Sequence, residues 1–306
     1  MGCGIYMKEF VKRILAKPIL LFDRLVIGFY LYMVKKKTAG IKELIFSKKK
    51  VLILAPHQDD EVLGCGCFIQ QGIEGDNKIK CVFMTDGSMS TDSINSEALA
   101  KTRKIEALEV AKKLKMELPE FLNKGDGILD SNDIDASKKV AEIIDEFKPD
   151  IIMIPYFMDG HSDHSATSGI FINAMEMIEN KARLFAYEIN SPISVYGITH
   201  YVDCASYMSS KSALLEIYKS QTMSFESVLL MNKLNGILAG TDGGVELFRE
   251  INFDSYKKTY EKYNKDNKVW MRFRQMYSIY FMVIAYFKGL RLKKEGAKYQ
   301  DFRMTQ

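Results

Sequence analysis

Apolar runs of strand length alternate with amphipathic segments of helix length through the middle of the chain. The runs are VLILAP (51–56), IKCVFMT (79–85), DIIMIPY (150–156) and LFAYEI (184–189). Helix-like patterns lie between them, near residues 61–73, 96–116 and 133–147. This order predicts an α/β fold with a mainly parallel sheet and helices on both faces. Ligands bind such sheets at the carboxyl ends of the strands.

Both ends of the chain combine apolar and basic segments. Residues 7–34 carry an apolar stripe at helical spacing, interrupted by Pro18 and followed by three consecutive lysines at 35–37. The uncharged run 276–287 is followed by basic residues within 288–294. Neither run is a clean stretch of the ~20 apolar residues that span a membrane. The pattern predicts a central α/β domain with helical segments at both ends of the chain.

The charge is distributed unevenly. The 306 residues are 47% hydrophobic and 27% charged, as in ordinary globular proteins, with a net charge of +4. Residues 1–50 carry +9, residues 268–306 carry +7, and the part between them carries −12. The basic ends favour an anionic surface as partner, and two interpretations stay open. The ends either lie in a membrane interface or form helices packed on the domain with solvated basic faces.

The five cysteines are Cys3, Cys65, Cys67, Cys81 and Cys204. Their odd number, and their place in apolar segments, predict small buried side chains in a reducing compartment. We therefore expect a cytoplasmic protein, either free or peripheral on the inner face of the membrane.

Three of the four histidines follow the ends of two predicted strands. His57 follows the first strand and precedes Asp59, Asp60 and Glu61, and the sequence His161-Ser162-Asp163-His164 follows DIIMIPY. Acids at a helix start often serve only the helix dipole, but that does not explain the histidines. Together His57, Asp60 and His164 form a two-histidine, one-carboxylate set, typical of catalytic zinc with an open position. Iron(II) fits the same ligands.

These motifs resemble the PIG-L/LmbE family of zinc-dependent N-acetylglucosaminide deacetylases. The family patterns P/A-H-P/A-D-D-E and H-x-D-H stand here as Pro56-His57-Gln58-Asp59-Asp60-Glu61 and His161-Ser162-Asp163-His164. Further matches, including Thr85-Asp86-Gly87, Arg103-x-x-Glu106 and Asp126-Gly127, extend the resemblance over residues 50–252. The resemblance thus implies a Rossmann-like deacetylase domain over residues 50–252, with helical extensions over 1–49 and 253–306.

The resemblance implies a role for each residue. It places zinc on His57, Asp60 and His164, and it makes Asp59 the general base. His161 would stabilise the tetrahedral oxyanion and help the amine to leave. Asp163 would orient His161, and its charge is expected to raise the pKa of that histidine. Arg103 would bind substrate or organise the site, unless it forms only a surface pair with Glu106.

Asp159 departs from the family pattern. Some members carry a tyrosine at this place, two residues before H-x-D-H, near the substrate carbonyl. An acid at the mouth of the site would favour a polar or amine-bearing substrate, or a second cation.

The implied function is zinc-dependent removal of the acetyl group from an N-acetylglucosamine-type glycan. The basic ends add the hypothesis of a lipid-linked substrate, such as a cell-envelope precursor. One alternative is an amidase or deacetylase of a soluble thiol-sugar conjugate, and another is a non-catalytic glycan-binding module. The sequence has no Walker or GxGxxG loop, which disfavours a nucleotide-binding protein. Nucleic acid is not expected as a partner.

Overall fold

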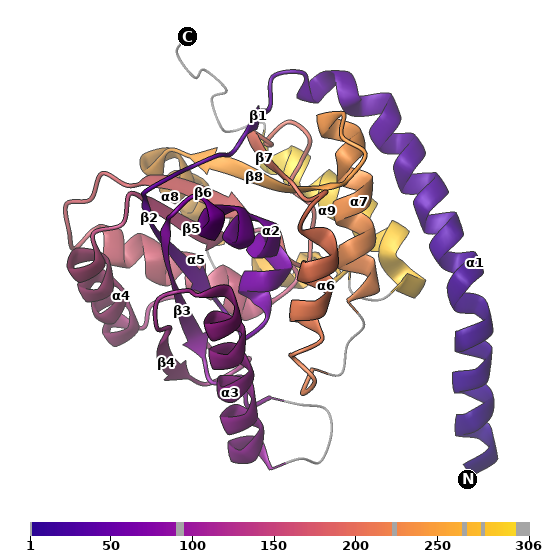
Figure 1. Ribbon diagram of the computed structural model, residues 1–306, viewed down its shortest axis with the longest axis horizontal. Coiled ribbons are helices and arrows are strands. Elements are labelled where there is room, and N and C mark those ends of the chain that lie inside the picture. The colour runs from indigo at the N-terminus through magenta and orange to yellow at the C-terminus, as the bar shows by residue number, and fades with distance from the viewer. Residues whose placement is uncertain (1, 90–94, 222–224, 265–267, 277–278, 298–306) are drawn as a thin grey trace.

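An eight-stranded sheet lies at the centre of the computed structural model, which describes residues 2–89, 95–221, 225–264, 268–276 and 279–297 (Figure 1). For residues 2–14, 279 and 295–297 only the backbone is described. Residues 277–278 and 298–306, which belong to the basic C-terminal segment, lie outside the described residues. The strand order is β1-β7-β8-β6-β5-β2-β3-β4. The strands are Lys42–Glu43 (β1), Lys50–Ala55 (β2), Lys78–Thr85 (β3), Glu120–Lys124 (β4), Ile151–Pro155 (β5), Arg183–Tyr187 (β6), His200–Asp203 (β7) and Val245–Ile251 (β8).

Strands β2 to β6 are parallel, and β8 runs antiparallel to both of its neighbours, β6 and β7. The expected α/β class with a mainly parallel sheet is confirmed. From β2 the chain moves outward through β3 to β4, and it then returns to place β5 on the other side of β2. The boundary between β2 and β5 is therefore the point where the strand order reverses, which is where α/β sheets bind ligands.

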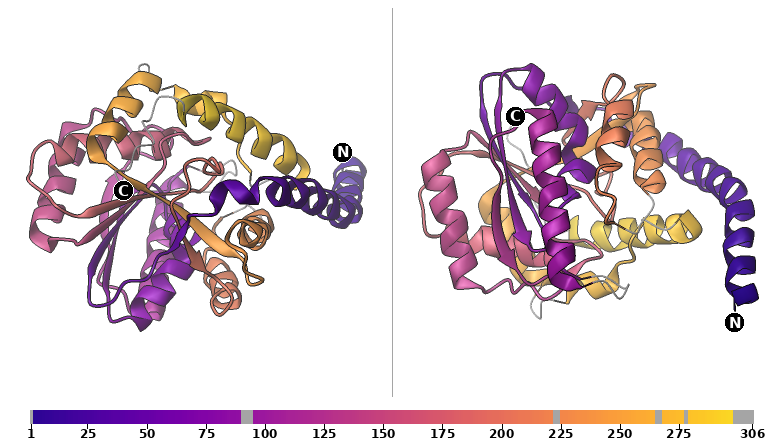
Figure 2. Two further views of the ribbon diagram at one scale, coloured as in Figure 1. Left: turned by 90° about the horizontal axis from the view of Figure 1, so that it is seen from above. Right: turned by 60° about the horizontal axis from the view of Figure 1, so that its bottom comes forward.

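Helices cover both faces of the sheet (Figures 1 and 2). Helices α2, α3 and α6 bury their apolar side chains with Val51 and Ile53 of β2, whereas α4, α5 and α8 meet Leu52 and Leu54 on the other face. Because side chains alternate along a strand, an unbroken apolar run is needed where both faces are covered. The helices are Gly2–Val34 (α1), Asp60–Glu74 (α2), Ser96–Leu114 (α3), Ile134–Phe147 (α4), Ser162–Met175 (α5), Met208–Leu215 (α6), Glu226–Ala239 (α7), Phe253–Tyr263 (α8) and Met282–Ala297 (α9).

A fully buried ion pair links helix α2 to later parts of the chain. Lys211 Nζ lies 2.7 Å from the carboxylate of Glu246 and also donates to the carbonyl oxygen of Leu63 in α2. The same carboxylate accepts from the backbone N–H groups of Cys67 and Phe68, also in α2. Every charge in this cluster thus has a partner, as burial requires.

Both ends of the chain join a third apolar cluster beside the sheet. Ile27 and Leu31 of α1 meet side chains of α7, β8 and α9 there. Helix α1 continues through Pro18, which is exposed, so water can reach the carbonyl group that its ring leaves unbonded. The N-terminal half of α1 projects beyond the rest of the molecule (Figures 1 and 2). Among the helices of the described residues, none is both long and apolar enough to cross a bilayer.

Candidate active site

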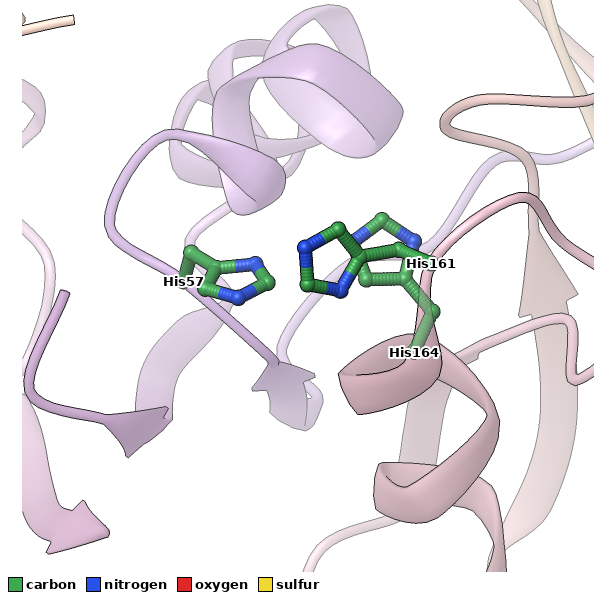
Figure 3. Close-up of side chains that lie close together, drawn as sticks. All are labelled: His57, His161 and His164. Atoms are coloured by element: carbon green, nitrogen blue, oxygen red, sulfur yellow. The ribbon is translucent and has the colours of Figure 1, made fainter. Parts of the chain in front are cut away.

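Two turns that follow β2 and β5 bring the predicted site residues together. His57 lies in the turn after β2, Asp59 caps helix α2, and Asp60 is the first residue of that helix. After β5 the chain passes through a loop to His161, which caps α5, and His164 lies in the first turn of α5. Since β2 and β5 are parallel neighbours, their carboxyl ends place both turns at one edge of the sheet. Figure 3 shows the ring of His57 facing those of His161 and His164.

The carboxylate of Asp60 lies between two imidazole rings. Its Oδ2 atom is 3.0 Å from Nδ1 of His57 and 3.3 Å from Nε2 of His164. The same oxygen accepts the backbone N–H of His57 at 2.9 Å, which fixes its place. All three side chains are buried. The structure therefore brings the two histidines and the carboxylate predicted as metal ligands into one contact.

His161 completes a group of three histidines. Its ring centroid is 4.6 Å from that of His57 and 5.1 Å from that of His164, and one nitrogen of each ring lies within 4.8 Å of the others. Nδ1 of His161 accepts the backbone N–H of Asp163 at 3.2 Å and so caps α5. An accepting Nδ1 carries no proton, so the neutral ring carries its proton on Nε2. A metal ligand needs an unprotonated nitrogen, which makes His161 a poorer donor than the other two histidines.

The Asp163 carboxylate contacts His57 and two backbone N–H groups. One of its oxygens lies 3.1 Å from Nε2 of His57 and accepts the N–H of Gly127 at 2.7 Å, and the other accepts the N–H of Leu129. Burial, followed by the positive charges of His57 and His164, lowers the pKa of His161 to about 4. The charge of Asp163 does act to raise this pKa, but burial and the charges of His57 and His164 outweigh it. The backbone N–H of Asp163 also donates to Nδ1 of His161.

Carboxylates surround the two remaining histidines. Burial acts to lower the pKa of His57, but its contacts with Asp126, Asp163 and Asp60 outweigh burial and raise it. In the same way Asp60 and Asp159 raise the pKa of His164 to about 9 against the effect of burial. A buried group of this kind holds more negative than positive charge and attracts a cation. Two imidazoles and a carboxylate are also donors that suit zinc or iron(II), so the residues present fit a metal ion.

Asp59 has an unusual backbone conformation. It caps α2 with φ of 131°, a region that side chains other than glycine rarely adopt. Its N–H donates to Glu61 at 3.2 Å, and the Glu61 carboxylate is itself hydrogen-bonded to Tyr218. Backbone strain of this kind is retained where the surroundings hold it, and it is common at functional sites. Burial, and then the charge of Asp60, raise the pKa of Asp59 well above its ordinary value.

Two carboxylates were not predicted as parts of this cluster. Asp126 lies 3.2 Å from Nε2 of His57, and the Asp126-Gly127 pair after β4 was its only signal. Asp159 is 3% exposed, so it does not lie at the mouth of the site as expected. Its Oδ1 is 2.9 Å from Nδ1 of His164, and its Oδ2 accepts the N–H of Asn190. The residue thus stands behind His164, on the side away from Asp60.

Arg103 is buried beside the cluster and does not form a surface pair. Its guanidinium lies 3.5 Å from Asp126 and donates to Gln221 at 3.1 Å. Gly87, with φ of +66°, makes this approach possible, because a Cβ atom there would be 2.6 Å from Arg103 Cδ. Glu106, the predicted alternative partner of Arg103, instead accepts hydrogen bonds from Ser220. Arg103 therefore contacts the Asp126 carboxylate, and Asp126 in turn contacts His57.

The architecture defines a class of protein: an α/β domain with a histidine–carboxylate cluster, able to hold a metal ion, where the strand order reverses. Within this class, residues 52–175 match the model of the PIG-L family, described as GlcNAc-PI de-N-acetylase. This match covers both motifs from which the resemblance to the PIG-L family was predicted.

Two relatives carry deacetylase names. The chain is 26% identical over 204 residues to a diacetylchitobiose deacetylase of Thermococcus kodakarensis, covering 62% of this chain and 76% of that protein. It is 30% identical over 135 residues to a probable N-acetyl-alpha-D-glucosaminyl L-malate deacetylase 2 of Bacillus subtilis, covering 42% of this chain and 61% of that protein. The expected enzyme class, an N-deacetylase among the hydrolases, is confirmed at this level.

Solved structures confirm the fold. The N,N'-diacetylchitobiose deacetylase of Pyrococcus horikoshii superposes with a TM-score of 0.61 at 24% identity, covering 68% of this chain and 85% of that one. The hydratase GalB of Pseudomonas putida superposes with a TM-score of 0.57 at 16% identity, covering 67% and 96%. Because a hydratase shares the fold, the fold alone does not determine the reaction.

Proposed function

We propose that the protein is a zinc-dependent hydrolase that removes the acetyl group from an N-acetylglucosamine-type unit. The observation that carries the proposal is the Asp60 carboxylate in contact with both His57 and His164, with Asp59 directly before it. The family description and the relatives' names supply the substrate type, since each refers to an N-acetylated amino sugar or its deacetylation.

His57, Asp60 and His164 would hold the metal ion, through Nδ1 of His57 and Nε2 of His164, the nitrogens that face Asp60. Bound zinc supplies Lewis acidity and lowers the pKa of a bound water from 15.7 to about 7. The opposite nitrogen of His57 faces Asp126 and Asp163, and Nδ1 of His164 faces Asp159. Metal-binding histidines commonly donate their other N–H to a carboxylate in this manner, which fixes ring orientation.

Asp59 and His161 carry the proton transfers. The raised pKa of Asp59 suits a general base that receives a proton at neutral pH. His161 is the most exposed of the three clustered histidines, and its Nε2–H is free of the cap contact made by Nδ1. It donates this hydrogen to the oxygen of the acetyl group as negative charge develops there. Asp126, itself in contact with Arg103, would fix the ring of His57. We also propose that Arg103 binds the substrate.

Acetate release tests the proposal. The zinc-loaded protein is incubated with N-acetylglucosamine that is free, inositol-linked or polyprenyl-linked, and acetate is measured in each case. We expect acetate release from at least one of these substrates. A chelator should abolish the release, and added zinc should restore it. Iron(II) reconstitution in parallel identifies the metal that supports turnover.

The same substrates separate the alternatives. A soluble thiol-sugar conjugate added to them, if it is cleaved in preference to all others, would favour the amidase interpretation. Binding of these sugars by folded, zinc-loaded protein without any acetate release would support a glycan-binding module and contradict the enzyme.

A lipid-linked substrate at the inner face of the membrane is the finer part of the proposal, and α1 supports it. Ile27, Leu31 and Val34 are buried on one face of this helix. The opposite face exposes apolar side chains, with exposed fractions from 58% to 69%: Leu21, Phe22, Leu25, Phe29, Tyr32 and Met33. Lys17, Arg24 and the lysines 35–37 are exposed along the same helix and just after it. An apolar face with basic neighbours suits insertion into an anionic bilayer surface.

We expect the protein to sediment with phosphatidylglycerol vesicles at low salt and not with phosphatidylcholine vesicles. Leu25→Glu should weaken this binding about tenfold or more, because burying a leucine is worth about 1.5–3 kcal/mol. Leu118→Glu is the matched control, since Leu118 is 74% exposed and lies outside α1. Failure of the unmodified protein to bind, or equal binding by both variants, would exclude this surface.

A further inference from the structure

The C-terminal segment contacts the loop after β5, which leads to His161, and the loop after β6, which contains Asn190. The backbone N–H of Met276 donates to the carbonyl of Asn190 at 3.1 Å. The side chain of Gln275 donates to the carbonyl of Gly160, the residue before His161. A Cβ atom on Gly160 would lie 3.2 Å from Gln275, so the two segments are closely packed. These contacts come from outside residues 52–175, the range that matches the family model.

Lys293 of α9 extends this contact into the interior. The basic residues Lys288, Arg291 and Lys294 are exposed, but Lys293 is only 2% exposed. Its Nζ donates to the carbonyl of Ser191 at 2.9 Å and lies 5.1 Å from the ring centroid of Tyr156. The expectation of a basic C-terminal surface therefore does not hold for this residue, whose charge points into the protein.

The charge of Lys293 acts on two buried carboxylates. Burial lowers the pKa of Lys293 to about 8, while Asp159 and Glu188 act in the opposite direction. Glu188 is held by the N–H of Ile193 and by Asn235. Asp159 has one oxygen on the N–H of Asn190 and the other against Nδ1 of His164. A buried carboxylate requires compensating charge or hydrogen bonds. Lys293 binds the carbonyl of Ser191, and the N–H of the preceding residue, Asn190, is the one that Asp159 accepts.

We propose that Lys293 is a positioning residue of the metal site. By binding the Ser191 carbonyl it fixes the loop whose Asn190 N–H keeps the Asp159 carboxylate against His164, and so it directs Nε2 of His164 toward Asp60. The inference rests on the proposed function, because it takes His164 as a ligand. A carboxylate behind a ligating histidine typically changes metal affinity about 10- to 100-fold when it is removed. Lys293 acts through that carboxylate without touching the ligands.

Zinc affinity, measured by competition with a chromogenic chelator, tests this role without any need for turnover. Lys293→Met should bind zinc about tenfold more weakly, whereas Lys294→Met, the same exchange at the exposed neighbour, should bind it as the unmodified protein does. In an Asp159→Asn background, Lys293→Met should change affinity less than about twofold, since coupled residues are not additive. An unchanged affinity in the single variant, or an equal loss in both backgrounds, would overturn the proposal.

The result separates this inference from the proposed function. If the variants show the expected zinc affinities but the unmodified protein releases no acetate, the enzyme is refuted and the positioning role remains. Absence of zinc binding by the unmodified protein would refute both. If Lys293→Met does not fold, thermal unfolding decides: folding restored by adding Asp159→Asn supports the pairing, and failure of both variants refutes it.

Discussion

Asp59→Asn is expected to lower the rate of acetate release about 100- to 10,000-fold, the usual contribution of a general acid or base. Asparagine has nearly the same shape as aspartate but cannot accept the proton. It also tolerates positive φ better than most residues, so the backbone at φ of 131° should persist. Zinc content should remain that of the unmodified protein, since Asp59 is not among the proposed ligands. The measurement is single-turnover acetate release together with metal analysis.

A matched control is available for this variant. Asp76→Asn makes the same exchange at an exposed aspartate that also has positive φ, 57°. It should retain full activity. Loss of zinc in Asp59→Asn would show that Asp59 is a ligand, and retention of activity would remove it from the proton transfers.

His161→Asn should release acetate about 100- to 1,000-fold more slowly while keeping zinc, the usual cost of losing one oxyanion donor. Asparagine is chosen because it caps helices well, so the start of α5 is preserved. His164→Asn should instead lose zinc and activity together. The difference between the two variants distinguishes a metal site made of His57, Asp60 and His164 from one made of the three histidines. The measurement is zinc stoichiometry after dialysis, with activity on the preferred substrate.

His200→Asn serves as the control, because His200 lies on β7 and outside the cluster. It should keep both zinc and activity. Should His161→Asn lose zinc as His164→Asn does, the three-histidine site would be correct and the assignment of Asp60 would fail.

Strands β2, β3, β5 and β6 could be predicted within a few residues because both faces of each are covered, which leaves an unbroken apolar run in the sequence. The edge strand β4, EFLNK, has no such run, since its residues are only partly buried or exposed. Strands β7 and β8 mix buried and partly buried positions, and their antiparallel pairing depends on partners distant in sequence. The helix-length patterns were also reliable, and α1 shows that a single proline need not end a helix.

The site could be predicted in part for a related reason. His57, Asp59 and Asp60 lie within five residues of the end of β2, so one local motif places all three. His161 and His164 follow the neighbouring strand in the same way. Asp126 and Asp159 were marked only by their place in or beside a motif, which did not show what they contact, and no local pattern marked Lys293. The contacts of the Asp163 carboxylate could not be predicted, because the N–H groups that it accepts belong to the loop after β4, which is distant in the sequence.

The buried pair of Lys211 and Glu246 has a consequence for how much of the chain can exist by itself. Helix α2 carries Asp60 at its start, and three of its backbone groups are bonded to this pair, from residues that lie beyond position 175. A fragment of residues 52–175 would leave those groups without their partners and would expose the apolar edge of β5 that β6 covers. We therefore expect residues 52–175 not to fold by themselves, although they contain both turns of the candidate site, because helix α2 depends on partners later in the chain.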